Sequence, residues 1–306
     1  MDHDDAADDP RAEGQLEAAW AEHRGYLLNI AYRLLGSLEE AEDMVQEAYL
    51  RLLRADLAAI ADLRGWLVVV TTRICLDHLG SARMRREART DRWLPEPIVQ
   101  ASADRPDPAE VVVLDESVRI ALLVLLERLK PAERVVFVLH DVFQYSFEEI
   151  APMVGRSAMA CRQLASRARR RIGAEPEARG SVDSETMRRV AERFIAACQG
   201  ADLRPLLDVL DPAVVGWTDV GGRRSTLARP AMGRAEVASG VRSLFGPQSR
   251  IRLTLTEVNG ETGIIATVGR RPIAVIVLSV GEDGLIKAIY AIADQQKLAR
   301  LRTGNG

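Results

Sequence analysis

The fold is decided by the stretch Gln144–Ile172, which reads QYSFEEIAPMVGRSAMACRQLASRARRRI. Ser146 and Glu149 form a capping box, which predicts that a helix begins there. Gly155 then permits a tight turn into a second helix. This pattern predicts a helix-turn-helix motif. Pro152 conflicts with it, because a proline inside the first helix should cost about 3 kcal/mol or kink the last turn.

The second helix of the motif would present a basic outer face. Ser157 is a suitable N-cap, and Cys161, Ala165 and Ala168 recur at helical spacing as a small apolar face. Arginine and glutamine read guanine and adenine edges, and unpaired arginines neutralise phosphates. A solvated basic helix is the alternative, but the capped partner helix favours DNA binding. We therefore expect DNA contacts from Arg162, Gln163, Ser166, Arg167 and Arg170.

Length and composition indicate a multidomain protein. The 306 residues suffice for two or three domains, and 47% hydrophobic with 28% charged residues is ordinary for a soluble chain. No apolar run approaches the length of a membrane span, and no signal peptide is recognisable. The cysteines Cys75, Cys161 and Cys198 are isolated in sequence, without metal-ligand spacing. We expect a cytoplasmic protein with no metal, no cofactor and no membrane partner.

Proline-rich and glycine-rich stretches divide the chain. Residues 93–110 hold four prolines and residues 173–183 are rich in glycine and charge, so both predict linkers. The blocks before and between them have helical periodicity. The predicted units are a helical domain over 15–92, a linker over 93–110, a second helical domain over 111–172, a linker over 173–183, and a third domain over 184–302.

The third domain has a different pattern. It begins with a capped amphipathic helix, Ser184–Cys198, and a shorter helix is expected over 203–210. Four later runs rich in β-branched residues predict an antiparallel meander, with turns at Asn259-Gly260, Arg271-Pro272 and Asp283-Gly284. Helices on one face of such a sheet make an α+β domain.

Two helical segments in the first domain carry a family resemblance. They read EEAEDMVQEAYLRLL (Glu39–Leu53) and LRGWLVVVTTRICLDHLGSARMRRE (Leu63–Glu87). Together with the helix-turn-helix, they resemble the extracytoplasmic-function (ECF) sigma factors over about Gln15–Ile172. The resemblance implies a protein that directs core RNA polymerase to specific promoters and initiates transcription, without enzymatic activity of its own.

The resemblance implies two further sets of site residues. In the helix Glu39–Leu53, the side chains expected to face the core are Met44, Ala48 and Leu52. In the family, the opposite, polar face of this helix binds the clamp of the polymerase. Core-polymerase binding is therefore expected of Asp43, Gln46, Glu47 and Arg51. The next helix and its end imply promoter contacts from Trp66, Arg73, Arg83, Arg85 and Arg86.

The motif WLPEP at Trp93–Pro97 is typical of a subgroup that ends in a SnoaL-like cone domain. The resemblance therefore implies two all-α sigma domains followed by an α+β SnoaL-like domain that regulates the sigma factor in cis. The subgroup's glycine-rich stretch survives as Asp219–Arg223, and its last motif only partly as Asp294–Leu298. The expected regulatory contact comprises Trp93, Leu94, Pro95, Glu96, Pro97, Asp219, Gly221, Gly222, Arg223, Lys297 and Leu298.

Two alternatives remain open. SnoaL-like folds include cyclases and isomerases that use a carboxylate base in an apolar pocket, for which Asp219, Asp294 and Tyr290 are candidates beside Trp217. In the second alternative, the chain is a helix-turn-helix regulator that never joins polymerase, fused to a SnoaL-like ligand-binding or cyclase/isomerase domain. The expected partners are core RNA polymerase and promoter DNA, with a small-molecule effector of the third domain as a further possibility.

Overall fold

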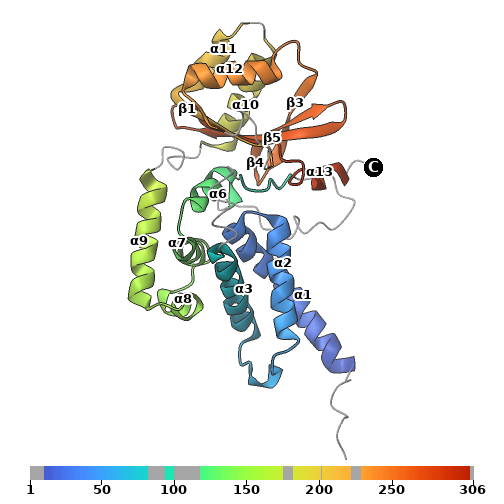
Figure 1. Cartoon of the computed structure of the whole chain (residues 1–306), viewed down its shortest axis with the longest axis vertical. Helices are drawn as coiled ribbons and strands as arrows, with labels where there is room; N and C mark the ends of the chain where they lie inside the picture. The colour runs from blue at the N-terminus through green and yellow to red at the C-terminus, as the bar shows by residue number, and fades with distance from the viewer. Residues whose placement is uncertain are drawn as a thin grey trace, which may run out of the picture.

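The computed structural model describes residues 10–81, 94–99, 118–174, 182–200, 202–221 and 229–303. Two helical units lie below a third unit in which helices cover one face of a sheet (Figure 1). This is the predicted fold class, two all-α domains followed by an α+β domain.

The first helical unit consists of three helices. Ser37 caps the second of them, accepting a hydrogen bond from the Glu40 amide at 3.3 Å, after Gly36 turns the chain at φ +68°. Asp62 caps the third through the Gly65 amide at 3.0 Å. The helices are α1 (Pro10–Leu35), α2 (Leu38–Leu52) and α3 (Leu63–Gly80), with a short 3-10 helix η1 (Leu57–Ala59) between the last two.

The second helical unit contains the predicted helix-turn-helix. Its elements are α6 (Ile120–Glu127), α7 (Pro131–Phe137), a π-helical turn η3 (Val138–Val142), α8 (Phe147–Val154) and α9 (Ala158–Ala174). The Ser146 amide donates to Glu149 Oε2 at 2.8 Å and the Glu149 amide to Ser146 Oγ at 3.2 Å, which is the predicted capping box. Gly155 ends α8 in the left-handed region, and α8 continues past Pro152 to Val154.

The two helical units share one hydrophobic core. Cys161, Ala165 and Ala168 are fully buried in it, as predicted, together with residues of α1, α2 and α3. The buried Arg134 guanidinium of α7 donates to the Leu34 carbonyl at the end of α1, at 2.8 Å. The sequence predicted two tethered modules, and in this structure they are packed against each other.

The third unit is a mixed sheet, and the sequence predicted only part of it. Strands β3 to β6 form the expected antiparallel meander, but β1 pairs with β6 in parallel, and the helix α12 was not predicted. The turn between β4 and β5 lies at Gly269-Arg270 rather than Arg271-Pro272, because Gly269 takes φ +61° there.

The sheet order is β2-β1-β6-β5-β4-β3. The helices are α10 (Ser184–Gln199), α11 (Arg204–Val209), α12 (Arg234–Phe245) and α13 (Arg300–Thr303), and the strands are β1 (Leu210–Asp219), β2 (Ala231–Met232), β3 (Ile251–Val258), β4 (Glu261–Val268), β5 (Arg271–Val280) and β6 (Ile286–Ile292).

The two faces of this sheet bury different partners. One face packs on α10, α11 and α12, with Phe194 fully buried between them. The other face forms a separate apolar core with Leu94 of the linker, Ile120 and Val124 of α6, and Leu298 of the C-terminal segment. In Figure 1 this second face is turned toward α6 and the helical units. The third unit is therefore docked by hydrophobic burial, the dominant favourable term in such contacts.

The cysteines are packing residues. All three are buried and unpaired with one another, and burial raises the pKa of the Cys75 and Cys198 thiols to about 12. A protonated, buried thiol is a poor nucleophile. Within the described ranges there is no cluster of ligand side chains suited to a metal ion, and no helix is long and apolar enough to cross a membrane.

We predict that Gly155→Ala destabilises the helix-turn-helix by roughly 1–2 kcal/mol, the usual strain of a left-handed Cβ residue. A Cβ at this position would meet no atom within 4 Å, so the backbone at φ +63° is the sole cause. Thermal unfolding measures the loss, and Gly155→Asn should lose less. A Gly155→Ala variant as stable as the wild type would contradict the assignment.

Candidate nucleic-acid interface and the interdomain junction

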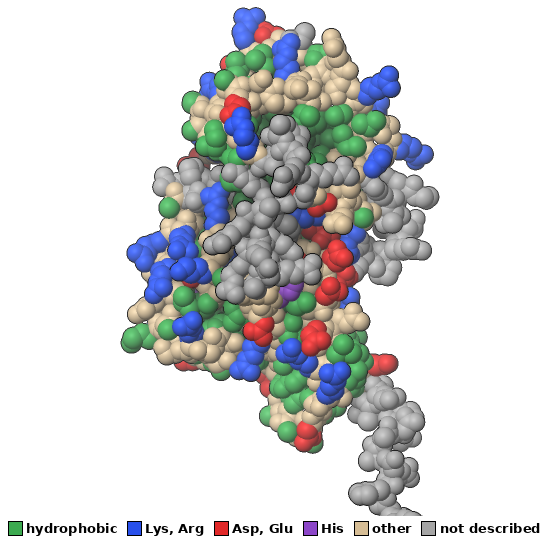
Figure 2. Space-filling view, viewed as in Figure 1, with side chains coloured by type: hydrophobic (Ala, Val, Ile, Leu, Met, Phe, Trp, Pro, Cys, Tyr) green, Lys and Arg blue, Asp and Glu red, His purple; other side chains and the backbone are tan. Residues whose placement is uncertain are grey.

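The outer face of α9 is basic, and part of its charge is already paired. Figure 2 shows the basic side chains gathered along this helix. The predicted DNA-contacting residues of α9, Arg162, Gln163, Ser166, Arg167 and Arg170, are all exposed. Three arginines of the helix form ion pairs within its own unit: Arg162 with Glu148 at 2.5 Å, Arg169 with Asp141 at 2.7 Å and Arg171 with Glu133 at 2.7 Å.

The pairing divides the predicted DNA contacts into two groups. Arg167 and Arg170 have no ion-pair partner among the described residues, so they are available to phosphates without rearrangement. Arg162 must leave Glu148 to read a base, but both side chains of that pair are more than half exposed. Exposed pairs contribute 1 kcal/mol or less, so DNA can compete for Arg162.

One residue of the predicted DNA face of the first unit contacts the second unit. Arg73 is exposed, and its guanidinium donates to the carbonyl of Pro152 in α8 at 2.9 Å. Trp66 is half-buried and packs on the shared core. Arg83, Arg85 and Arg86 lie outside the described residues. In this conformation, one residue expected to touch promoter DNA instead holds the helix-turn-helix in place.

The predicted polymerase-binding face of α2 is exposed, apart from the half-exposed Glu47. Val45, Ala48 and Leu52 are buried, while Met44 is only partly so. Glu47 and Arg51 form an exposed ion pair at 3.0 Å. Three neighbouring leucines that were not predicted as site residues have exposed fractions that are large for an apolar side chain: Leu50 (40%), Leu53 (52%) and Leu57 (44%). Their position beside the polar face was the available signal, and exposed apolar patches commonly mark docking sites.

The linker motif, the Asp219 stretch and the last motif meet at one point. The Leu94 amide donates to Asp219 Oδ2 at 2.9 Å, and the Lys297 ammonium contacts the same oxygen at 2.7 Å. Lys297 also donates to the Leu94 carbonyl, and Leu298 is fully buried in the same core as Leu94. Gly221 adopts φ +70°, and a Cβ there would lie 2.5 Å from the Asp294 carboxylate. Trp93, Gly222 and Arg223 lie outside the described residues.

Glu96 fixes the linker to the first helical unit. Its buried carboxylate accepts hydrogen bonds from the Leu38 amide at 2.7 Å and from the Ser37 hydroxyl at 3.2 Å, so it caps α2 from a distant part of the chain. Arg300 of the C-terminal segment contacts Glu96 at 3.4 Å and Glu42 of α2 at 2.6 Å. The tail of the third unit therefore touches both the linker and the helix of the predicted polymerase-binding face.

A residue predicted only to form a turn, Asn259, connects all three units. Asn259 is 1% exposed and occupies the left-handed region at φ +53°. Its backbone amide and side-chain Oδ1 bond to the Ile98 carbonyl and amide at 2.7 and 2.9 Å. Its Nδ2 donates to Tyr32 Oη of α1 at 2.8 Å and to the Val118 carbonyl at 2.7 Å. The Asn-Gly pair predicted the turn, but no local pattern could predict these distant partners.

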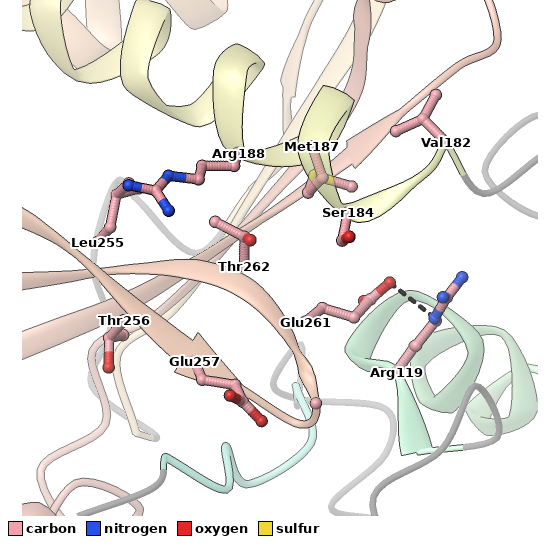
Figure 3. A pocket seen from close by; sticks show the side chains of 11 residues that line it. Arg119, Val182, Ser184, Met187, Arg188, Leu255, Thr256, Glu257, Glu261 and Thr262 are labelled. Atoms are coloured by element: carbon pink, nitrogen blue, oxygen red, sulfur yellow. Dashed lines mark ion pairs between the residues drawn. The ribbon is translucent and has the colours of Figure 1, made fainter.

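The neighbouring contacts close the same junction. Glu261 forms an ion pair with Arg119 at 2.7 Å, directly after Val118, and Val99 pairs with Val258 in an isolated bridge. Figure 3 shows the Arg119–Glu261 pair at the edge of a crevice of about 450 Å³ between the start of α6, the start of α10 and the β3–β4 turn. We call the contacts of Asn259 and Glu261 with the linker and both helical units the junction.

The candidates for acid-base catalysis do not assemble. A second cavity of about 370 Å³ lies between α12, β1 and β6, and Trp217 is among its lining residues. Asp219, Asp294 and Tyr290 do not line it. Asp219 binds Lys297 instead, and Tyr290 belongs to the core on the other face of the sheet. The carboxylate among the lining residues is Glu236, which is paired with Arg229 at 2.5 Å, so none of the three candidates supplies the base that the cyclase alternative requires.

We predict that Asn259→Gly weakens the junction while keeping its backbone conformation. The substitution leaves the Val118 carbonyl and the Ile98 amide without their side-chain partner, at about 1–3 kcal/mol for each buried group left unsatisfied. Thermal unfolding and the rate of proteolysis in the linker should report the loss. The matched variant Gly269→Ala changes the β4–β5 turn, at the opposite end of β4 from Asn259, and linker cleavage equal in both variants would refute the assignment.

We also predict strong coupling between Asp219 and Lys297, whose side chains are 7% and 10% exposed. Removing one partner leaves a buried charge uncompensated, which costs on the order of 3–5 kcal/mol. Asp219→Asn and Lys297→Met should each destabilise the docked domain, and the double variant should lose much less than their sum. Additive losses in denaturant unfolding would show that the pair does not act as a unit.

Comparison with known protein families agrees with this architecture. Residues 19–85 match the family described as sigma-70 region 2, and residues 119–172 match sigma-70 region 4. A probable ECF RNA polymerase sigma factor, SigI of Mycobacterium tuberculosis, is 43% identical over 95% of this chain and 97% of its own length. SigJ of the same organism is 39% identical over 90% of both chains. The crystal structure of SigJ superposes with a TM-score of 0.71 at 35% identity, covering 92% of this chain and 98% of the other.

Proposed function

This chain belongs to the extracytoplasmic-function RNA polymerase sigma factors, and we propose that its third domain regulates it in cis by holding a closed form. As a sigma factor it directs core RNA polymerase to specific promoters. In the closed form, the linker and both helical units are bonded to the third domain. Opening would free the linker to extend and the two DNA-binding units to separate.

The observation that carries this proposal is the junction. Asn259 bonds to α1, to the linker and to the start of the second helical unit, so these parts cannot separate while it is seated. Arg73 is bonded to Pro152 in the same conformation. While the Arg73 side chain makes this interdomain contact it cannot bind DNA, so docking of the domains and promoter binding compete.

Covalent tethering makes such competition effective. A short linker holds the third domain at an effective concentration in the millimolar range, so modest docking energy suffices to close the protein. The Arg300 contacts with Glu42 and Glu96 support a link to polymerase binding, since Glu42 lies on the same helix as Asp43 and Gln46. Polymerase engaging α2 would then loosen the C-terminal segment.

We assign the following roles within this proposal. Core polymerase binds Asp43, Gln46, Glu47 and Arg51, with Leu50, Leu53 and Leu57 as apolar neighbours. Promoter DNA binds Arg162, Gln163, Ser166, Arg167 and Arg170, together with Trp66 and the basic end of α3. The protein acts where the polymerase is, in the cytoplasm. The alternative of a helix-turn-helix regulator that ignores polymerase gives no role to the exposed face of α2.

We predict that truncation after Asp294 raises run-off transcription with core polymerase severalfold over the full chain. It removes Lys297 and Leu298, which contact Leu94 of the linker, and Arg300, which contacts Glu42 of α2. A second truncation at Ile172 removes the whole third domain and tests whether that domain also assists. Equal activity of all three proteins would exclude regulation in cis.

Co-elution with core polymerase separates the sigma factor role from the regulator alternative. The truncated form should co-elute at lower concentration than the full chain if α2 is partly obstructed. Failure of every form to co-elute with polymerase would favour a regulator that acts without it.

We predict that Arg167→Ala and Gln163→Ala weaken promoter binding in different ways. Loss of a phosphate contact should reduce affinity on all sequences and lower the salt dependence by about one unit of slope. Loss of Gln163 should cost about 1–3 kcal/mol at one base pair and leave the salt slope unchanged. Arg169→Ala, whose guanidinium is paired with Asp141, serves as the matched control. Identical effects of all three substitutions would contradict the assigned face.

A further inference from the structure

One apolar side chain of α9 points into solvent and has no role so far. Met159 is 67% exposed, the highest exposed fraction among the large apolar residues that the structure describes. It stands in the first turn of the helix, which the Ser157 hydroxyl caps by accepting a hydrogen bond from the Ala160 amide at 3.2 Å. Single exposed apolar residues are common on protein surfaces, so exposure alone would not indicate a function.

The position of Met159 on the helix is the second observation. Residues three, four, seven and eight positions apart share one face of a helix. Counted in this way from Met159, the same face carries the predicted DNA contacts Arg162, Gln163, Ser166, Arg167 and Arg170. The buried residues Cys161, Ala165 and Ala168 lie on the opposite face. Met159 is therefore the apolar member of an otherwise polar face, at its N-terminal end.

The chemistry of the major groove limits what an apolar side chain there can contact. Base edges present hydrogen-bond donors and acceptors, and the apolar group among them is the C5 methyl of thymine. In helix-turn-helix proteins, residues at the N-terminal end of the second helix contact base edges. A methionine side chain is unbranched and adaptable, so its thioether and terminal methyl can pack on a thymine methyl. Cytosine has only a hydrogen at the same position.

We propose that Met159 reads a thymine in the promoter element that α9 contacts, through the C5 methyl group of that base. The inference rests on the proposed binding of promoter DNA by this face of α9. Arg162 and Gln163, one turn further along the helix, then read neighbouring base pairs by hydrogen bonds. Arg167 and Arg170 bind phosphates. Sequence preference therefore combines an apolar contact at one base pair with polar contacts at the next.

The first part of the test finds the element. It uses holoenzyme formed from the full chain and core polymerase, with a library of DNA duplexes that carry a randomised segment as the probe. The wild type should select an element with a thymine at a position where Met159→Ala has no base preference. Gln163→Ala should change the preference at a different position. Met232→Ala removes a similarly exposed methionine (59%) from the third domain, and it should select the wild-type element.

The second part of the test removes the methyl group from the DNA. Each thymine of the selected element is replaced in turn by uracil, which differs only in lacking the C5 methyl. At one position the affinity of the wild type and of Met232→Ala should fall about three- to fivefold, the loss expected for one buried methyl group. Met159→Ala should bind both duplexes equally. Thermal unfolding verifies that the variants are folded.

Three results would overturn the inference and leave the proposed DNA face of α9 in place, provided that Gln163→Ala still changes the selected element. The first is an element without a selected thymine. The second is a uracil effect that is absent, or equal in the wild type and Met159→Ala. The third is weaker co-elution of Met159→Ala with core polymerase at unchanged base preference, which would place the methionine on polymerase instead. An element that neither Gln163→Ala nor Met159→Ala alters would contradict the DNA face itself.

Discussion

The buried amide of Asn259 is the contact on which the closed arrangement depends. A short polar side chain at the tip of a β-hairpin satisfies groups from α1, from the linker and from the start of the second helical unit. Buried polar groups must find partners, and the Ile98 amide and the Val118 carbonyl would lose theirs if the hairpin moved away, whereas the Tyr32 hydroxyl would keep its bond to the Glu96 carbonyl. The interaction is therefore cooperative: one residue is seated only when three parts of the chain are correctly placed.

Hydrophobic burial drives the docking of the third domain, and the Asn259 hydrogen bonds fix the position in which it docks. The core formed by Leu94, Ile120, Val124 and the sheet brings the third domain onto the helical units, and the hydrogen bonds fix its register. The same closed form places Arg73 against Pro152 and Arg300 against Glu42. Both contacts use residues on helices to which we assign promoter or polymerase binding. Contacts within the closed chain therefore compete with contacts to promoter DNA and to polymerase. This competition is the physical basis of the regulation proposed above.

Local patterns predicted the helix-turn-helix well because its determinants are local. The capping box, the glycine turn and the small apolar face each depend on residues within a few positions of one another. The parallel strand β1 and the helix α12 were missed, since β1 holds Asp211-Pro212 and α12 holds Ser239-Gly240, which are poor signals for strand and helix.

The contacts of the candidate site were predictable only in part. The motif resemblance indicated that the linker, Asp219 and Lys297 would interact, and the structure brings Leu94, Asp219 and Lys297 together. It could not indicate Asn259, whose partners lie 141 to 227 residues away in sequence. Nor could it indicate that Arg162, Arg169 and Arg171 are paired within their own unit, because those acids lie on other helices.

The most direct measurement is the distance between the two helical units in solution, with spin labels at Ala21→Cys in α1 and Met159→Cys in α9. Both positions are exposed, and the native cysteines are buried. The closed form predicts a single narrow distance distribution for the free chain and a longer distance once core polymerase is added. A free chain that already shows a broad distribution, or a distance that polymerase leaves unchanged, would contradict the closed form.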